Sequence, residues 1–458
     1  MINVAVQGLG FVGCAMSVAI ASRTDTKGQP LFNVIGVDLP TKSGQKKIHD
    51  LNNGIFPFRN NDKKLSIELG KAVERGNLTA TDDKNVYSDV SIIIVSINCD
   101  LVIQDEEQKI DLDSFSKSIS EIAHRIVEET LVIIESTVPP GTCEKIVYPI
   151  FENSFKRRKL NIQKFYLAHS YERVTPGSKY LDSIVNYWRV FSGINDTSGH
   201  KCATFLSKVI NTSDYPLTRL ENTTASETGK LLENSYRAVN IAFIDEWSRF
   251  AEDVGIDLYE ILQAISLRPT HSNIRQPGFG VGGYCPTKDP LFAKIAAKDL
   301  LRLNGHQFPF STRSVETNKK MPFGTLEKIK NYFEGDLEGR KLLVMGITYK
   351  PDIGDTRFSP SEIFFRQAIL LGAEVDCYDP MIEYWDELQI DLDSNLPKAS
   401  DYDAVIFAVA HKEFANIAIE KWLVGNKTLI FDANNVLTEN QVREIKKYKL
   451  NYQSVGRG

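Results

Sequence analysis

Strong charge of one sign, long apolar runs and paired-cysteine motifs are all missing from this sequence of 458 residues. The formal net charge is −5, which does not favour a surface for nucleic acid. Apolar runs such as Ile92–Val95 are far shorter than the roughly 18 residues that suggest a membrane-spanning helix. We therefore expect neither nucleic acid nor a membrane among the partners of this protein.

Cysteine is scarce as well, with six residues that show no CxxC spacing and no neighbouring histidine cluster. Disulfide frameworks and zinc sites both depend on such patterns, so the sequence predicts neither of them and no metal site. The chain also starts directly on an apolar strand pattern, without the features of a signal peptide. These absences favour a reduced, cytoplasmic protein.

Apolar runs alternate with helix-length segments towards both ends of the chain. Such runs, rich in β-branched residues and without polar alternation, are typical of parallel strands that are buried on both faces. The predicted strands are residues 3–6, 34–38, 91–95 and 131–135 in the first part of the chain, and 341–346, 374–378, 404–408 and 429–432 in the last part.

The middle of the chain has a different pattern. From about Thr218 to Gly255, apolar residues recur at helical spacing with no proline or turn cluster. The sequence therefore predicts an α/β fold, with two Rossmann-like, doubly wound parallel-sheet domains joined by a central helical domain that contains a long helix. The predicted domain boundaries are 1–212, 213–318 and 319–458.

Three glycines, Gly8, Gly10 and Gly13, directly follow the first predicted strand and open a helix. This spacing permits a tight turn and lets the backbone approach a pyrophosphate group. Asp38 ends the next strand, where a carboxylate would bind ribose hydroxyls and repel a 2′-phosphate, so the pattern favours NAD. A turn that only connects strand to helix, with Asp38 as a helix cap, is the alternative. The residues predicted to contact the cofactor here are Gly8, Gly10, Phe11, Val12, Gly13 and Asp38.

The segment Gly278–Pro290 is dense in glycine around Cys285 and is followed by the charged pair Lys288 and Asp289. Glycines suit a backbone that wraps closely around a ligand, and the charges lie within reach of a thiol or a substrate hydroxyl. A structural loop with a buried, inert cysteine would explain the glycines but not the charges. The residues alone leave both interpretations open.

This segment resembles the GGxCxxKD signature of the UDP-glucose/GDP-mannose dehydrogenase family. Further motifs in the order of that family cover essentially the whole chain. They are the N-terminal glycine pattern, Glu135–Thr142, Tyr171–Gly177, the helix that bears Lys230 and Asn234, Gly346–Asp352 and Asp355–Arg357.

The resemblance implies an NAD-dependent, four-electron oxidation of the C6 hydroxymethyl group of a UDP-sugar to a carboxylate, for cell-surface polysaccharide synthesis. Asp289 and Lys230, with a water held by Asn234, would take the proton from the C6 hydroxyl. Cys285 would then form a thiohemiacetal and a thioester. Without the resemblance, Lys230 would be interpreted as a solvated helix charge and Asn234 as a surface amide.

The resemblance also implies further roles. Glu172 would assist water in hydrolysing the thioester, with Thr137 helping to place that water beside the cofactor. Lys350 would bind the nucleotide sugar and Arg357 would lie on the cofactor side, although either could form a surface salt bridge, and Glu172 could pair with Arg173. The long helix would form the core of a homodimer. The residues implied to contact substrate are Glu172, Arg173, Lys230, Asn234, Gly282 and Lys350.

The sugar is less sharply indicated. The Glu172–Gly177 loop looks like the branch that acts on UDP-N-acetylhexosamines, which favours UDP-N-acetylglucosamine or UDP-N-acetylmannosamine. Lys288 and Asp289 instead resemble the glucose branch, so UDP-glucose is the alternative. Ser96–Cys99 and Asn434–Asn435 depart from the pattern of the family.

Two other classes of protein share parts of this pattern. A two-electron dehydrogenase of the 6-phosphogluconate or 3-hydroxyacid type has a Rossmann domain and a helical middle, but it lacks a thiol nucleophile and a third α/β domain. A nucleotide-sensing protein without turnover would not need Cys285 together with Lys230, Asn234 and Asp289.

Overall fold

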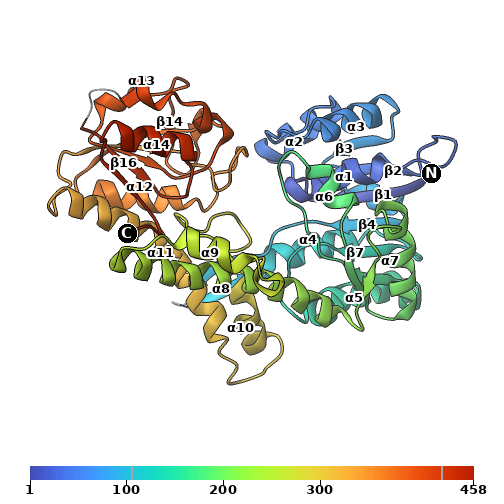
Figure 1. The fold of residues 1–458 in the computed structure, drawn as a ribbon. Helices are drawn as coiled ribbons and strands as arrows, with labels where there is room; N and C mark the ends of the chain where they lie inside the picture. The colour runs from blue at the N-terminus through green and yellow to red at the C-terminus, as the bar shows by residue number, and fades with distance from the viewer. Residues whose placement is uncertain (105–106, 424–426) are drawn as a thin grey trace. The chain divides into compact units, whose positions relative to one another are not determined.

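The computed structural model describes residues 1–104, 107–423 and 427–458. These residues form two compact units: residues 1–233 with 292–307, and residues 234–291 with 308–458. Each unit contains a large sheet of mostly parallel strands (Figure 1). The predicted α/β class with a helical middle is confirmed, whereas the three predicted domain boundaries remain a prediction.

Eight strands form the sheet of the first unit, in the order β10-β9-β8-β7-β4-β1-β2-β3. β1 lies between β2 and β4, so the chain winds outward from it in both directions. Only the β8–β9 pair is antiparallel in this sheet. The strands are β1 (Ile2–Gln7), β2 (Phe32–Val37), β3 (Leu78–Thr81), β4 (Ile92–Val95), β7 (Leu131–Ile134), β8 (Tyr166–His169), β9 (Val190–Gly193) and β10 (Thr218–Arg219). β5 (Asp100–Gln104) pairs with β6 (Glu107–Asp111) in a separate two-stranded antiparallel sheet.

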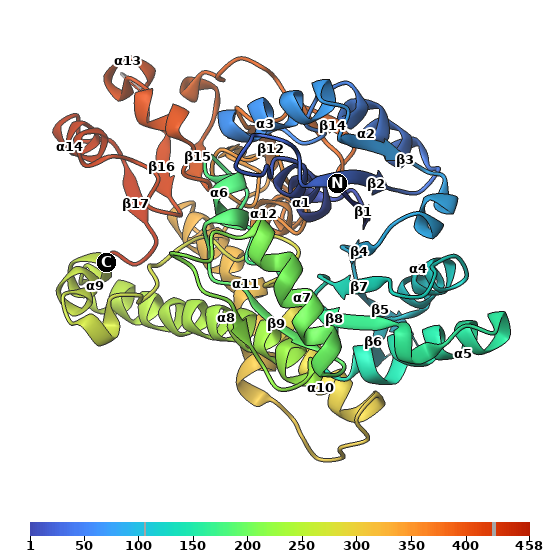
Figure 2. The same ribbon diagram turned by 90° about the vertical axis from the view of Figure 1, so that its right-hand side faces the viewer.

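Helices cover both faces of this sheet (Figure 2). Side chains alternate along a strand, so Val4 and Val6 pack on one face and Ala5 packs on the other. The first face packs against α1 (Phe11–Ala21), α2 (Lys42–Asn52), α3 (Lys63–Glu74), α6 (Tyr180–Val185) and α7 (Asp196–Val209). The second packs against α4 (Asp113–Ala123) and α5 (Tyr148–Arg158). The basic run 156–159 lies at the C-terminal end of α5.

A single helix, α8 (Thr223–Val254), occupies the predicted helical stretch and has 32 residues. At 1.5 Å per residue it is roughly 48 Å long. Its first part, to Glu233, belongs to the first unit and the remainder to the second. The helices that follow are α9 (Leu258–Ser266), α10 (Asp289–Asp299) and α11 (Pro309–Tyr332).

Five parallel strands form the sheet of the second unit, in the order β12-β11-β15-β16-β17. They are β11 (Lys341–Met345), β12 (Glu374–Tyr378), β15 (Ala404–Phe407), β16 (Leu429–Asp432) and β17 (Tyr452–Ser454). α11 and α12 (Pro360–Leu370) pack on one face, and α13 (Ile419–Leu423) and α14 (Glu439–Lys447) pack on the other. A small hairpin pairs β13 (Tyr384–Trp385) with β14 (Ile390–Asp391).

The strand order of this second sheet reverses at β11, because the chain passes from β11 to β12 on one side and later returns to β15 on the other. Ligands of open α/β sheets bind outside the carboxyl ends of the strands at such a reversal. The loops that follow β11 and β15 are therefore the first place to look for a ligand site in the second unit.

Candidate active site

The glycine turn between β1 and α1 has the geometry that a dinucleotide requires. Gly8 has a φ of +95°, and a Cβ added there would lie 2.5 Å from the Ser96 carbonyl oxygen. A Cβ on Gly13 would lie 1.9 Å from the Gly8 carbonyl oxygen, so the helix packs directly against the turn. A Cβ on Gly10 would meet nothing within 4 Å. Backbone is therefore packed tightly at two of the glycines and lies open at the third.

The first turn of α1 can bind phosphate. Its N-cap residue is Gly10, which has no side chain to accept hydrogen bonds from the backbone N–H groups of that turn. Such groups, together with the positive end of the helix dipole, bind anions. They belong to Phe11, Val12 and Gly13, beside the open space at Gly10. These residues fit the pyrophosphate of NAD.

Asp38 directly follows β2 and is 8% exposed. Its carboxylate lies 2.5 Å from Lys47 Nζ and accepts a hydrogen bond from the Leu39 N–H. Thr41, rather than Asp38, caps α2, because the Thr41 hydroxyl accepts the Gly44 N–H. The interpretation of Asp38 as a helix cap is therefore wrong, and its carboxylate lies at the strand end where a ribose would be bound.

Thr137 follows β7 and is partly exposed, just before a turn that a buried glutamate holds in place. Glu227, on α8, accepts hydrogen bonds from the backbone N–H groups of Gly141 at 2.6 Å and Cys143 at 2.8 Å. Burial raises the pKa of Glu227 to about 7. Gly141 has a φ of +92°, which a glycine adopts without strain. Glu227 was not predicted from the sequence, since it lies 84 residues beyond Cys143.

Lys230 and Glu172 form a buried pair in the first unit. Lys230 Nζ donates to the Glu172 carbonyl oxygen at 2.7 Å and lies 3.3 Å from its carboxylate. The two side chains are only 8% and 12% exposed. Lys230 is therefore not a solvated helix charge. Since the Glu172 carboxylate also accepts the Val174 N–H, the loop fixes its orientation.

Arg173 has a different partner from the one considered in the sequence analysis. Its guanidinium pairs with Glu233 on α8 and donates to the Trp188 carbonyl oxygen at 2.9 Å. The Tyr171 hydroxyl donates to the same Glu233 carboxylate at 2.9 Å. Tyr171 and Arg173, on either side of Glu172, thus both attach this loop to α8. The alternative pairing of Glu172 with Arg173 is therefore wrong.

A buried ion pair that was not predicted from the sequence lies close to Glu172 and Lys230. Glu135, at the end of β7, accepts a hydrogen bond from Arg189 at 3.0 Å, and both side chains are at most 4% exposed. Burial and, to a smaller extent, the charge of Glu172 raise the pKa of Glu135 to about 7, although Arg189 acts to lower it. Glu135 therefore adds a titratable carboxyl close to Glu172.

Cys285 differs from the other five cysteines, all of which are buried, because it is partly exposed. It lies in the glycine-rich loop that leads into α10. The Asp289 N–H donates to the Cys285 carbonyl oxygen at 3.0 Å, so the cysteine lies one turn before the first residue of that helix. The alternative of a buried thiol is therefore wrong, and the reactivity of Cys285 stays a prediction.

Asp289 is completely buried and accepts hydrogen bonds on both carboxylate oxygens. Asn234 Nδ2 donates to Oδ2 at 2.7 Å, and Lys288 Nζ lies 3.1 Å from Oδ1. Lys288 Nζ also lies 4.2 Å from the centre of the Tyr284 ring. Asn234 is 6% exposed, so it is not a surface amide. The second unit thus brings Asn234, Asp289 and the Cys285 loop together.

The loop after β11 packs against the Cys285 loop. A Cβ on Gly282 would lie 2.6 Å from the Cβ of Tyr349, and one on Gly283 would lie 2.7 Å from its ring. The Gly283 N–H also donates to the Arg357 carbonyl oxygen at 3.2 Å. Glycine is therefore required at both positions for the two loops to meet.

Two predicted cations lie on the segment after β11. Lys350 is partly buried, and burial together with the nearby charge of Arg237 lowers its pKa. Arg357 forms a two-point ion pair with Asp355, at 2.9 Å and 2.7 Å. The salt bridge considered for Arg357 is therefore present, and its side chain lies 5.6 Å from the centre of the Tyr284 ring.

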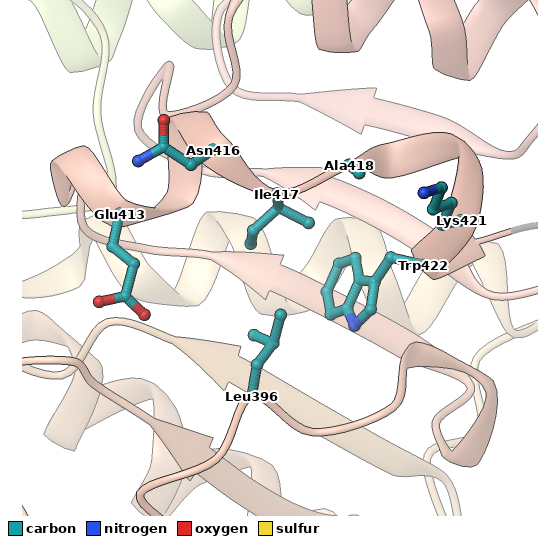
Figure 3. Close-up of a pocket in the computed structure, with 7 residues that line it drawn as sticks. All are labelled: Leu396, Glu413, Asn416, Ile417, Ala418, Lys421 and Trp422. Carbon is teal, nitrogen blue, oxygen red and sulfur yellow. The ribbon is translucent and has the colours of Figure 1, made fainter.

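A cavity of about 430 Å³ lies elsewhere in the second unit. Figure 3 shows the side chains that line it: Leu396, Glu413, Asn416, Ile417, Ala418, Lys421 and Trp422. None of the predicted site residues belongs to this lining.

In the described ranges of the chain, 1–104, 107–423 and 427–458, no helix is both long enough and apolar enough to cross a membrane. In the same ranges, no group of three or more histidine, cysteine, aspartate or glutamate side chains is placed to hold a metal ion.

Comparison with known proteins identifies the family of this chain. Models of the UDP-glucose/GDP-mannose dehydrogenase family match the chain in three parts: the NAD binding domain at residues 2–210, the central domain at 224–320 and the UDP binding domain at 343–439. The chain belongs to the UDP-glucose/GDP-mannose dehydrogenase family. It is an NAD-dependent UDP-sugar dehydrogenase, as its motifs predicted.

Individual relatives cover nearly its whole length. A UDP-N-acetyl-D-mannosamine dehydrogenase of Methanocaldococcus jannaschii is 32% identical over 440 residues, which is 95% of this chain and 92% of the relative. A UDP-N-acetyl-D-glucosamine 6-dehydrogenase of Pseudomonas aeruginosa is 25% identical over 96% of this chain and 98% of the relative. The solved structure of a UDP-D-ManNAc dehydrogenase from Pyrococcus horikoshii has a TM-score of 0.80 at 26% identity and covers both chains fully.

Proposed function

We propose that this dehydrogenase oxidises C6 of UDP-N-acetylmannosamine to the carboxylate through a thioester on Cys285, and so supplies a uronate for cell-surface polysaccharide. The observation that carries the proposal is the setting of that cysteine. It is the partly exposed thiol of the chain, and its loop leads directly into the buried Asp289, which Asn234 and Lys288 hold.

The first oxidation needs a group that accepts the proton of the C6 hydroxyl. Asp289 suits this role because hydrogen bonds from Asn234 and Lys288 hold its carboxylate in one orientation. Lys230 is proposed to share the proton transfer and then to stabilise negative charge on the substrate oxygen, since its amine is buried and held by Glu172. Bound NAD⁺ supplies the hydride acceptor in both oxidations.

The second oxidation proceeds on the thiol. The Cys285 thiolate adds to C6 of the aldehyde and forms a C–S bond, which gives a thiohemiacetal. Loss of the remaining C6 hydride leaves a thioester. Water, with Glu172 as the base and Thr137 assisting its placement, then adds to C6, and the C–S bond breaks with release of the thiolate and the carboxylate.

The sugar is proposed from the loop and the relatives. The Tyr171–Gly177 loop resembles that of the acetamido-sugar branch, and the Methanocaldococcus relative is a UDP-N-acetyl-D-mannosamine dehydrogenase. UDP-glucose is the alternative outside this branch, because the Lys288–Asp289 pair resembles the glucose branch. UDP-N-acetylglucosamine, the substrate named for the Pseudomonas relative, is the closest competitor.

Initial rates of NADH formation with UDP-N-acetylmannosamine, UDP-N-acetylglucosamine, UDP-glucose and UDP-galactose test the choice of sugar. We expect kcat/KM for UDP-N-acetylmannosamine to exceed that for each of the others by about tenfold or more, which corresponds to roughly 1.4 kcal/mol of discrimination. A higher kcat/KM with UDP-glucose would overturn the assignment to the acetamido branch.

A homodimer is also proposed, from an unpartnered stripe on α8. Large apolar side chains recur there every three to seven residues, and each is about half exposed in the single chain: Tyr236, Phe243, Trp247, Phe250 and Val254. Monomeric proteins rarely expose a continuous apolar stripe of this kind. A second copy can cover it by packing the same helix face against itself about a two-fold axis.

The molar mass in solution tests the dimer. We expect the wild type to elute as a dimer in light-scattering chromatography, and Phe243→Glu/Trp247→Glu to elute as a monomer. Leu267→Glu, which changes a side chain that is 83% exposed outside the stripe, is the matched control and should remain a dimer. A monomeric wild type would refute the proposal.

A further inference from the structure

His411 lies four residues beyond the end of β15, beside the reversal of strand order in the second sheet, and is fully buried. Its ring contacts the loop that follows β11 at two points. The Asp352 N–H donates to Nδ1 at 3.0 Å, and Nε2 lies 3.1 Å from the Thr348 hydroxyl. Because Nδ1 accepts this backbone hydrogen bond, Nε2 is the ring nitrogen that can act as a donor.

Asp379 completes the contact from the other side of β11. It directly follows β12, and its Oδ2 accepts the backbone N–H groups of Ile347 at 2.8 Å and Thr348 at 3.1 Å. His411 Nε2 lies 3.1 Å from the same oxygen. The loop after β11 is thus held by one side chain from each neighbouring strand.

The backbone at Asp352 has a strained conformation, which contacts of this kind stabilise. Its φ is +59°, a left-handed conformation that is strained for a residue other than glycine. The Lys412 N–H donates to the Asp352 carboxylate at 3.1 Å, and Lys412 Nζ lies 3.2 Å from it. His411 and its neighbour Lys412 therefore fix both the backbone and the side chain of Asp352.

Lys350 lies between the two anchored points of this loop. The Thr348 hydroxyl lies 3.2 Å from the Lys350 carbonyl oxygen, and Tyr349 packs against Gly282 and Gly283 of the Cys285 loop. Burial and the charge of Arg237 lower the pKa of Lys350, so the amine is held where loss of solvent and a neighbouring positive charge disfavour its charged form. A loop free to relax would move this amine towards solvent.

We propose that His411 is a positioning residue of the nucleotide-sugar site: through the Asp352 N–H it fixes the loop that presents the Lys350 amine to the UDP diphosphate. The inference rests on the proposed role of Lys350. Since it concerns UDP rather than the sugar, it does not depend on which UDP-sugar is oxidised.

Three substitutions of His411 separate its two hydrogen bonds. In His411→Asn the side-chain oxygen can still accept the Asp352 N–H but cannot reach Asp379. In His411→Gln the amide can reach Asp379 but no acceptor remains at the place of Nδ1, and His411→Ala removes both contacts. The measurements are UDP binding by calorimetry on the full chain, together with KM for UDP-sugar, KM for NAD and kcat.

We expect UDP to bind about tenfold more weakly to His411→Ala and His411→Gln, and within about threefold of wild type to His411→Asn. KM for the UDP-sugar should rise in the same order, while kcat at saturation and KM for NAD stay within about twofold. Equal UDP affinity in wild type and His411→Ala, or equal losses in all three variants, would overturn the proposal.

A double-mutant cycle with Lys350→Ala separates positioning from general destabilisation. If His411 acts through Lys350, His411→Gln should weaken UDP binding by less than about twofold once Lys350 is already alanine. A full additional loss would contradict that route. Tyr378→Phe, which removes only the 2.6 Å hydrogen bond from the Tyr378 hydroxyl to Glu413 and keeps the backbone contacts of that residue, is the matched control and should bind UDP as wild type does. A wild type that fails to bind UDP would instead refute the proposed function itself.

Discussion

An aspartate occupies the same position in both sheets but makes different contacts in each. In each, the first strand is followed by a glycine with positive φ, Gly8 at +95° and Gly346 at +94°. In each, an aspartate directly follows the neighbouring strand, Asp38 after β2 and Asp379 after β12. Asp38 pairs with a lysine side chain, whereas Asp379 accepts hydrogen bonds from the loop of its own sheet and from His411.

This difference shows how one architecture supports two kinds of binding. The Asp38 carboxylate, next to the side chain of Lys47, remains suited to accept hydrogen bonds from a ribose. The Asp379 carboxylate is completely buried and already accepts hydrogen bonds from several donors around it. It therefore stabilises a loop rather than binding a ligand. Under the proposed function, recognition in the second unit then falls to cations such as Lys350. The fold provides the position, and the local contacts decide its use.

Removing the second aspartate should have the largest effect. Asp379→Ala leaves several buried N–H donors without an acceptor, so we expect a loss of about 3 kcal/mol or more in the free energy of unfolding. Asp38→Ala serves as the matched substitution in the first sheet and should cost less than about 1 kcal/mol. Denaturant midpoints of the two variants measure the difference, and equal midpoints would mean that the two positions are equivalent after all.

The pH dependence of stability should distinguish two buried carboxyl groups. Burial would raise the pKa of Asp379, but hydrogen bonds from His411 and from backbone N–H groups outweigh it and lower that pKa. Burial raises the pKa of Glu227 to about 7, and the backbone N–H groups oppose it only in part. Between about pH 4.5 and pH 7 the contribution of Glu227 should therefore fall as the pH rises, while that of Asp379 stays constant.

Glu227→Gln measures this directly, because glutamine does not titrate. The stability advantage of wild type over Glu227→Gln should be largest near pH 5 and smaller near pH 8, by on the order of 2 kcal/mol. Thermal midpoints at the two pH values provide the comparison. An advantage that grows with pH would show that the folded state prefers the ionised glutamate.

The smallest of these effects should appear in cofactor selection. Asp38→Ala removes an acceptor for the ribose hydroxyls, so KM for NAD should rise about tenfold, and the preference for NAD over NADP should shrink. Affinity for UDP should stay unchanged, because the substitution lies in the other unit. An unaltered KM for NAD would show that Lys47 keeps Asp38 from the cofactor.

The repetitive parts of the fold were predictable from the sequence. Continuous apolar runs identified eight strands of the two sheets, and helical spacing identified α8, because burial on both faces or on one stripe leaves a regular pattern. The short strands β3 and β17 mix polar with apolar residues, and the pattern did not reveal them. The glycine turn at Gly8 was predictable because its spacing is local.

Side-chain partners were much harder to predict. Glu227 binds a turn more than eighty residues earlier in the chain, and His411 contacts a residue 59 positions before it. Contacts between residues so far apart in the chain leave no periodic pattern in the sequence. One signal was present for His411 and Asp379, since both are polar residues that follow buried strands at the carboxyl edge of a sheet. The partner of Glu172 could not be chosen from its neighbours, because the folded chain brings Lys230 closer than Arg173.

The most direct test of the thioester mechanism is the amount of NADH formed per sugar consumed, with identification of the product, for wild type and Cys285→Ser. We expect two NADH and one uronate per sugar from the wild type, and no uronate from the variant, whose hydroxyl is a poor nucleophile and leaving group. One NADH per sugar from the wild type, or full conversion to the acid by Cys285→Ser, would contradict a thioester on this cysteine.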